Sequence, residues 1–298
     1  MELPGVVDLH MHSNVSDGTD SPEELTGLVR RAGIRLFSLT DHDAVSGCGR
    51  IRKLTASADI SGAGQKEEYP MFVTGVEFSC GDEYGKYHIL GYGYDPESEG
   101  VMRVVNQGRR YRMKKFFARL SFLRDYFGFS FSETDTERLL KNYNPGKPHI
   151  ANLMVKYGYA KTKEEAIKRY IDKKNFRSEY VRPEEAIRGI LDGGGIPVLA
   201  HPTYGDGGQL IMGEEMEKRV LRLMEAGLQG LEAYYSGFSP GMQNELLRYA
   251  ERFQLYVTAG SDYHGHNKLV RLGDTNLDDT RSGAEGLKRF LEEIMRRV

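Results

Sequence analysis

The chain has 298 residues, enough for one large domain or for one domain that carries an insertion. Its net charge of −2 gives no global attraction to nucleic acid or to an acidic membrane, and no apolar run reaches membrane-spanning length. With only Cys48 and Cys80, a disulfide framework is not expected. The first residues, MELPGVVDLH, lack the basic and apolar regions of a signal peptide, so we expect a cytoplasmic protein.

Strands and helices alternate through the first hundred residues. Ser21-Pro22-Glu23-Glu24 predicts a capped helix, which Gly33 would end. Apolar runs predict strands at 6–12, 36–40, 71–79 and 87–94, and the polar, glycine-rich segment 61–69 predicts a loop. This alternation indicates an α/β fold with a largely parallel sheet.

The pattern changes from about Val101 to Arg182, where several helices and no convincing strand are predicted. Beyond this segment the alternation resumes. Helices are predicted at 183–195, at 213–227, from Pro240 and from about Gly283, with strands at 196–201, 228–235 and 255–262. We expect a βα barrel formed by residues 1–100 and 183–298, with residues 101–182 inserted as a helical cap over the site.

Nine histidines and acidic residues fall at or just after the ends of predicted strands. They are His10, His12, Asp17, His42, Glu77, His88, His201, Asp262 and His264. Two residues apart on a strand, His10 and His12 face the same way, as do Asp262 and His264. Each block alone is commonly structural, but six of the eight histidines occupy such positions. We therefore predict a metal site.

The ligand types indicate which ions would bind. Imidazole nitrogens and carboxylate oxygens without thiolates suit Mn, Zn or Fe. Nine ligands exceed the needs of one ion and suit two or three divalent ions, with Glu77 bridging, although a buried ion pair would also explain a carboxylate there. We expect Asp41 to accept a hydrogen bond from a ligand histidine, or otherwise to cap a turn.

The stretches DLHMHSNVSDG, LTDHD, GVEFS, HILGYGY, AHP and GSDYHG together resemble the PHP (polymerase and histidinol phosphatase) superfamily of metal-dependent phosphoesterases. The resemblance implies a distorted (β/α)7 barrel with a trinuclear site. It assigns the ligands to three ions: His10, His12, Glu77 and Asp262; Glu77, His88 and His201; and Asp17, His42 and His264. At position 17 the chain has aspartate, as in the branch that contains nucleotide phosphatases and enzymes acting on short RNA. Proteins that resemble histidinol phosphatases commonly carry histidine there.

This chemistry predicts in-line attack on phosphorus by a metal-bridging hydroxide held by Glu77. The expected substrate is a 3′,5′-bisphosphonucleotide or a nucleoside monophosphate. Alternatives are a 5′–3′ exonuclease acting on short RNA or single-stranded DNA, a histidinol-phosphate phosphatase, and a non-catalytic barrel that binds metal or nucleotide. We expect a small phosphate ester or a short oligonucleotide as partner, no membrane, and no obligate protein partner.

The predicted insertion begins with a basic helix. Residues 101–124 contain no acid and eight basic residues: Arg103, Arg109, Arg110, Arg112, Lys114, Lys115, Arg119 and Arg124. Such a run is usually a solvated helix face, but beside a phosphoester site it suits a second phosphate. The segment KPHIAN resembles a basic-x-His patch of the nucleotidase-like branch, so Lys147 and His149 are candidate substrate contacts, or His149 merely starts a helix. Arg177 and Arg182 are weaker candidates.

Overall fold

The computed structural model describes residues 6–58, 70–141, 143–176, 178–204, 209–277 and 283–297. One seven-stranded sheet follows the order of the chain. Its strands are β1 (Val6–Asp8), β2 (Ile34–Leu39), β3 (Met71–Asp82), β4 (Gly85–Tyr92), β5 (Ile196–Leu199), β6 (Gly230–Tyr235) and β7 (Tyr256–Gly260). Among the described residues, no helix combines the length and apolar character needed to span a bilayer.

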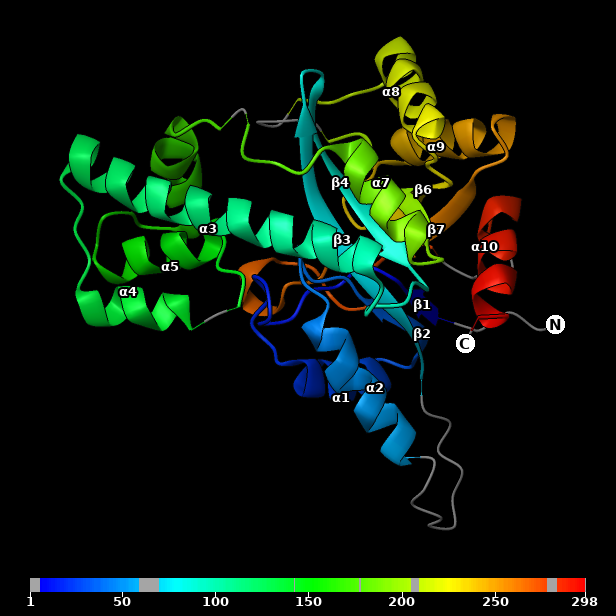
Figure 1. Cartoon of the computed structure of the whole chain (residues 1–298), viewed down its shortest axis with the longest axis horizontal. Coiled ribbons are helices and arrows are strands. Elements are labelled where there is room, and N and C mark those ends of the chain that lie inside the picture. The colour runs from blue at the N-terminus through cyan, green and yellow to red at the C-terminus, as the bar shows by residue number, and fades with distance from the viewer. Residues whose placement is uncertain are drawn as a thin grey trace.

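The helices fall into two groups, one around the sheet and one beside it (Figure 1). Around the sheet lie α1 (Pro22–Arg31), α2 (Ser46–Ala58), α7 (Pro183–Asp192), α8 (Gly213–Glu225), α9 (Pro240–Arg252) and α10 (Glu285–Met295). The cap side contains α3 (Glu99–Phe127), α4 (Glu133–Leu140), α5 (Lys147–Lys156), α6 (Lys163–Glu165) and the turns η1 (Ala166–Tyr170) and η2 (Ile171–Lys173). A further turn, η4 (Gly265–Asn267), follows β7.

β4 runs antiparallel to both of its neighbours, whereas all other neighbouring strands are parallel. It forms a hairpin with β3, whose register runs from Gly75 opposite Tyr92 to Asp82 opposite Gly85. At the tip, Asp82 Oδ1 accepts hydrogen bonds from the backbone of Tyr84 (2.8 Å) and Gly85 (3.1 Å). The sheet is therefore largely parallel, as predicted, with one reversed strand that the sequence did not reveal.

The first and last strands approach each other at the ends that carry the predicted ligands. In the described residues no strand ladder joins β1 to β7, so the sheet is not closed by strand pairing. Backbone hydrogen bonds join the segments instead, from Leu9 N–H to Ala259 O (2.9 Å) and from Asp262 N–H to His10 O (2.7 Å). The prediction of a distorted barrel with a helical insertion is confirmed.

Helix α3 belongs to both the barrel and the cap, and Figure 1 shows it extending from α7 across to α4 and α5. Val101, Val104 and Val105 pack into the main apolar core with the sheet and α7. Phe116 and Leu123, further along α3, pack in a separate apolar cluster of the cap. One continuous helix therefore contributes to both apolar cores and links the cap to the barrel.

One helix of the structure was not predicted from the sequence, and one predicted loop cannot be compared with it. Helix α2 was not predicted, since the segment contains Gly47 and Gly49 and few apolar residues at helical spacing. The predicted loop at 61–69 lies outside the described residues.

Gly189 permits the close contact between α3 and α7. A Cβ at this position would lie 2.5 Å from Val104 Cγ2 and 2.9 Å from Gly100 O. We expect Gly189→Ala to lower the free energy of unfolding by about 1–3 kcal/mol through overpacking, measured by urea denaturation. The control is Gly49→Ala on α2, where a Cβ meets nothing within 4 Å, and which should raise stability by up to about 1 kcal/mol. Equal effects of both variants would contradict the close packing.

Candidate metal centre

The structure brings all nine predicted ligands together at one end of the barrel. His10 and His12 follow β1, His42 follows β2, His201 follows β5, and Asp262 and His264 follow β7. Parallel strands of a barrel present their C-terminal ends on the same face, which explains how distant segments meet there. Glu77 and His88 lie within β3 and β4, and Asp17 lies in the loop after β1.

The first ligand group consists of His10, His12, Glu77 and Asp262. Glu77 Oε2 lies 3.4 Å from His10 Nε2 and 3.2 Å from His12 Nε2. Asp262 Oδ1 lies 3.5 Å and 3.3 Å from the same two nitrogens. A tetrahedral ion with ligands at roughly 2.1 Å requires donor atoms about 3.4 Å apart. The four distances between these carboxylate oxygens and imidazole nitrogens therefore match the spacing of metal ligands.

The second group uses the other oxygen of Glu77. Its Oε1 lies 2.8 Å from His88 Nδ1 and 3.1 Å from His201 Nε2, and the two nitrogens are 3.2 Å apart. In the β3–β4 hairpin Ser79 faces His88, so Glu77 and His88 are diagonal neighbours on one face. Glu77, only 1% exposed, thus presents one oxygen to each group.

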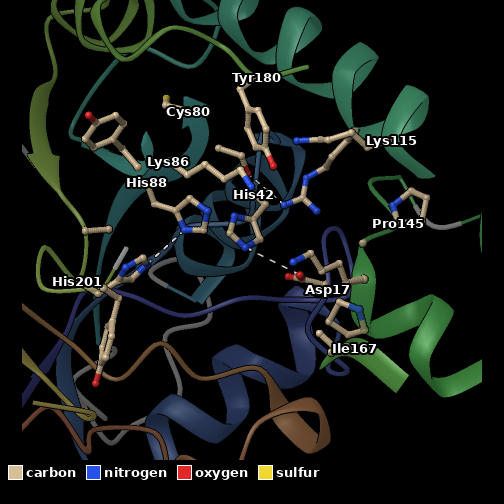
Figure 2. Close-up of a pocket in the computed structure, with 18 of the residues that line it drawn as sticks. Asp17, His42, Cys80, Lys86, His88, Lys115, Pro145, Ile167, Tyr180 and His201 are labelled. Carbon is tan, nitrogen blue, oxygen red and sulfur yellow. Dashed lines mark hydrogen bonds and ion pairs between the residues drawn. The ribbon is translucent and has the colours of Figure 1, made fainter. Parts of the chain in front are cut away.

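The third group, around Asp17, is wider. Asp17 Oδ1 lies 3.4 Å from His264 Nε2, and Asp17 Oδ2 lies 3.9 Å from His42 Nε2. The other nitrogen of His42, Nδ1, lies 3.0 Å from Glu77 Oε2. Figure 2 shows His42 between His88 and Asp17, so the three groups form one continuous cluster.

Unsatisfied polar atoms in this cluster fit divalent cations. Four buried atoms make no hydrogen bond within the described part of the chain: His10 Nε2, His12 Nε2, Asp17 Oδ1 and His42 Nδ1. Buried polar atoms are normally paired, and these face one another at metal-ligand spacing. The side chains present are therefore able to hold metal ions.

The electrostatics of the cluster also require positive charge. Burial raises the pKa of Glu77, but His88, His42 and His10 outweigh burial and hold that pKa well below its ordinary value. Burial lowers the pKa of His10, but the carboxylates of Glu232, Glu77 and Asp262 raise it well above its ordinary value. The buried acids thus demand cations, which protons on the imidazoles or metal ions can supply.

Glu232, in β6, holds two of the ligand residues and was missed in the sequence. It is fully buried, and its Oε1 lies 2.8 Å from His10 Nδ1. Its Oε2 accepts a hydrogen bond from the His201 backbone N–H at 2.7 Å, which fixes His201 at a φ of 28°. An acid within an apolar strand, as at Glu77, was the signal that could have identified it.

Asp262 is held by groups that the sequence analysis did not single out either. Its φ is 58°, an uncommon value for a residue with a side chain. Its Oδ2 accepts hydrogen bonds from Tyr235 Oη at 2.8 Å and from the ammonium of Lys268. A Cβ at Gly260 would lie 2.2 Å from His10 Cβ, so only glycine allows β7 to approach this ligand.

Asp41 does not contact a ligand histidine directly. Its carboxylate accepts hydrogen bonds from Ser13 N–H (2.8 Å), Ser13 Oγ (2.7 Å) and Ser16 Oγ (2.6 Å). Ser16 Oγ lies 3.5 Å from His12 Nδ1, so this serine links Asp41 to a predicted ligand, and the charges of Asp41 and His12 also interact through space. Asp41 fixes the loop between His12 and Asp17, which is closer to the turn-capping alternative.

The cluster opens into a cavity of about 400 Å³ under the cap (Figure 2). Asp17, His42, His88 and His201 form part of its lining. Among the described residues, its basic lining residues are Lys86, Arg112, Lys115, Arg119, Lys147 and Arg219, and Asp17 is the only carboxylate in the lining. The cavity is therefore strongly basic in a protein of net charge −2.

Two contacts attach the cap to the rim of the cluster. Asn144 Nδ2 donates hydrogen bonds to the carbonyl oxygens of His42 (2.9 Å) and Asp43 (3.0 Å). Arg112 Nε donates to Asp43 Oδ2 at 3.0 Å. Because Asp43 adjoins His42, these contacts fix the cap directly against the ligand loops.

The predicted substrate contacts have different positions. Lys147 lines the cavity and pairs with Asp172 at 2.6 Å. His149 starts α5, where its Nδ1 accepts a hydrogen bond from Gly146 N–H at 3.0 Å. Arg182 lies outside this cavity, pairs with Glu83 and Glu184, and is exposed. Arg177 lies outside the described residues.

No family model matches the chain. It is 27% identical to a 3′,5′-nucleoside bisphosphate phosphatase of Chromobacterium violaceum over 266 residues, which cover 87% of each chain. It is 28% identical to a 5′–3′ exoribonuclease of Haemophilus influenzae over 276 residues, 91% of this chain and 94% of the relative. A solved structure from Bifidobacterium adolescentis, classed as a metal-dependent phosphoesterase, is 26% identical with a TM-score of 0.78, covering 99% and 98% of the two chains.

The similarity extends along nearly the whole fold, and the nine predicted ligands converge at one end of it. The chain is similar along nearly its whole length to phosphoesterases, in agreement with the resemblance of its motifs to the PHP superfamily. In this protein the histidines and acids cluster at the barrel end and can hold metal, and the inserted cap lies over them. The interpretation made from the sequence motifs is confirmed at the level of the superfamily.

Glu232 offers a test of this candidate metal centre. Glu232→Gln removes the charge that orients His10 but keeps the side-chain size, so the fold should persist. We expect the affinity for Mn²⁺ to fall about 10- to 100-fold, measured by competition with a chromogenic chelator. Glu225→Gln, on the exposed end of α8, is the matched control and should bind Mn²⁺ like the wild type. Unchanged affinity in Glu232→Gln would remove Glu232 from the support of the centre.

Proposed function

We propose that this protein hydrolyses a phosphate monoester of a nucleotide, using divalent metal ions held by the nine-residue cluster. The observation that carries the proposal is the position of Glu77, whose two oxygens face two different ligand groups at 2.8–3.4 Å. A carboxylate shared in this way suits a pair of neighbouring ions, which is the arrangement used for phosphoester hydrolysis.

The ligand groups support three ions. His10, His12, Glu77 and Asp262 would hold one, Glu77, His88 and His201 a second, and Asp17, His42 and His264 a third. The donor set of nitrogen and carboxylate oxygen suits Mn, Zn or Fe. When bound, such ions would supply an activated water at neutral pH and positive charge for the phosphoryl oxygens.

The side chains of the protein would contribute positioning and exclusion of water. Glu232 and Tyr235 fix the orientation of His10 and Asp262. The cap shields the cluster, because Gly146 closes over Asp17 so tightly that a Cβ there would lie 3.2 Å from Asp17 Oδ2. Basic residues along the cavity would orient an anionic ester toward the ligands.

The size and charge of the cavity favour a small anionic substrate. A volume of about 400 Å³ lies within the range of small-molecule sites. Six basic residues line it, which suits a phosphorylated compound such as a 3′,5′-bisphosphonucleotide or a nucleoside monophosphate. The similarity to a nucleoside bisphosphate phosphatase over 87% of the chain supports the same class.

An adjoining cavity favours the second candidate, a 5′–3′ exonuclease on short RNA or single-stranded DNA. This cavity, of about 830 Å³, shares Lys86 and Tyr180 with the first and is lined by Tyr84, Tyr111 and Phe176, which could stack on bases. It also contains Asp82, Glu83 and Glu185 against the cations Lys86 and Arg182. A polyanion leaving the first cavity would meet these acids, so we favour the small nucleotide.

Two other candidates have less support. Histidinol-phosphate hydrolysis would fit histidine at position 17, where this chain has aspartate. A non-catalytic metal- or nucleotide-binding barrel would be expected to lose ligands, and none of the nine is missing.

The proposal is tested by phosphate release from adenosine 3′,5′-bisphosphate, AMP, histidinol phosphate and a short 5′-phosphorylated RNA, with Mn²⁺. We expect Mn²⁺-dependent turnover of the mononucleotides at a higher kcat/KM than of the RNA or histidinol phosphate. Degradation of the RNA alone would favour the exonuclease, and no turnover of any ester would favour the binding module.

Ligand variants test the role of the cluster. His88→Ala should reduce kcat/KM at least about 100-fold, because it removes one of the three ligands of the second group. His266→Ala is the control, since His266 is exposed and outside the cluster, and its activity should match the wild type. An active His88→Ala enzyme with full metal content would contradict the assignment.

A further inference from the structure

Within the part of the chain that the structure describes, two buried cations of the cap have no acidic partner. Lys115 and Arg119, one helical turn apart on α3, are only 6% and 7% exposed and line the cavity. Among the described residues neither forms an ion pair with a carboxylate, and Arg119 Nε has no hydrogen-bond partner. Buried cations are normally paired, because removal of an isolated charge from water costs several kcal/mol.

On α8, Arg219 also lines the cavity, is 7% exposed and lies 4.7 Å from the ring centroid of Tyr87. Two other cations of the lining do have acidic partners. Arg112 is paired with Asp43, and Lys147 with Asp172. Lys115 and Arg119 contact aromatic rings instead. Lys115 Nζ lies 3.6 Å from the ring centroid of Tyr180, and the Arg119 guanidinium lies 4.9 Å from that of Phe176. Aromatic faces attract cations but leave their charge unneutralised, so an anion can still bind.

The position of this pair separates it from the metal ligands. In Figure 2 Lys115 extends from α3 toward Tyr180, on the side of the cavity opposite His201. A substrate phosphoryl group at the ligand cluster would leave these two cations uncontacted. A second anionic group on the same molecule could reach them across the cavity of about 400 Å³.

We infer that Lys115 and Arg119 form a binding site for a second phosphate group of the substrate, which makes the preferred substrate a bisphosphate rather than a monophosphate. This inference rests on the proposed function. An ammonium and a guanidinium on one turn can both donate charge-assisted hydrogen bonds to a single phosphate, which is the strongest class of such contact.

The surroundings of Lys115 make anion binding at this site depend on the protonation of Lys115. Burial, reinforced by the positive charge of Arg112, lowers the pKa of the Lys115 ammonium to about 7. The ionisable groups around it come from several elements: Arg112 and Arg119 on α3, Asp43 after β2, Cys80 on β3, Lys86 on β4, and Tyr180. Asp43 favours the charged form, and the three basic neighbours oppose it. A bound phosphate dianion would therefore draw a proton onto Lys115.

The direction of the pH effect follows from this charge. Below pH 7 Lys115 is cationic in the free protein, and its charge is lost as the pH rises through 7. Binding of the second phosphate should then weaken by about tenfold per pH unit above 7. Phosphate itself is already a dianion in this range, so its own ionisation does not contribute.

The test compares kcat/KM for adenosine 3′,5′-bisphosphate with kcat/KM for p-nitrophenyl phosphate, which lacks the second group. Lys115→Met and Arg119→Met should each lower the ratio of these values about 10- to 100-fold at pH 7. Lys114→Met is the matched control, because Lys114 is exposed and pairs with Glu179, and its ratio should equal that of the wild type. Equal losses on both substrates would overturn the inference.

The variant Lys115→Arg separates the effect of the positive charge on phosphate binding from the effect of its loss at high pH. Arginine keeps its charge at every accessible pH, so the ratio should stay within about threefold of the wild type at pH 7 and should not fall between pH 7 and 9. The wild-type ratio should fall over the same range, because kcat/KM reports the ionisation of the free enzyme. A wild-type ratio that is constant with pH would contradict the coupling to Lys115.

A binding measurement distinguishes failure of this inference from failure of the proposed function. If no ester is hydrolysed, adenosine 3′,5′-bisphosphate is titrated into the Mn²⁺-loaded protein by calorimetry at pH 8, in two buffers of different ionisation enthalpy. Proton uptake in the wild type, with at least about tenfold weaker binding by Lys115→Met, would support the anion site without catalysis. Unchanged affinity in Lys115→Met would overturn it. Thermal unfolding of each variant identifies any loss of the fold.

Discussion

A single buried carboxylate, Glu77, organises this structure. Two of the histidines around it, His10 and His12, follow the first strand, whereas His201 comes from the other side of the inserted cap. A carboxylate removed from water is costly unless cations surround it, and here the cations must come from segments far apart in the chain. The barrel can therefore be complete at this end only when both halves of the chain have met around Glu77, which couples folding to the binding of positive charge.

The same constraint explains the supporting residues. Glu232 orients His10 and fixes the backbone of His201, while Asp262 is held by Tyr235 and Lys268. Both His201 and Asp262 have positive φ values, so their backbones are strained at the sites where they present their side chains. Hydrogen bonds from neighbouring strands hold these conformations. The cluster is consequently preorganised by the sheet rather than by flexible loops.

Much of this arrangement could be predicted from the sequence, because parallel strands bring their C-terminal ends to one face of the fold. Because His42 and His264 each follow an apolar run, the sequence was sufficient to predict that their side chains lie on this face. The reversed direction of β4 was not predictable, since an apolar strand has the same pattern in either orientation. Glu232 lies within an apolar strand, as Glu77 does, but it was missed because it belongs to none of the motifs that carried the resemblance.

For the basic helix α3, the sequence did not predict which of its basic side chains are buried. Its composition indicated an anionic ligand, but charge alone does not distinguish buried from exposed residues. The helical spacing of Arg112, Lys115 and Arg119 places them on one face, which was the available signal. Which face is buried depends on the packing of α3 against α7, and that packing comes from Gly100 and Gly189.

The reversed strand has a consequence for how such an enzyme can diversify. Because Glu77 and His88 are held by a ladder of eight residue pairs, their mutual position is independent of the tip at Glu83 and Tyr84. That tip borders the cavity next to the one over the ligands. Insertions or substitutions at this turn can therefore reshape the neighbouring cavity while Glu77 and His88 keep their mutual position, so that cavity can change without moving these two residues.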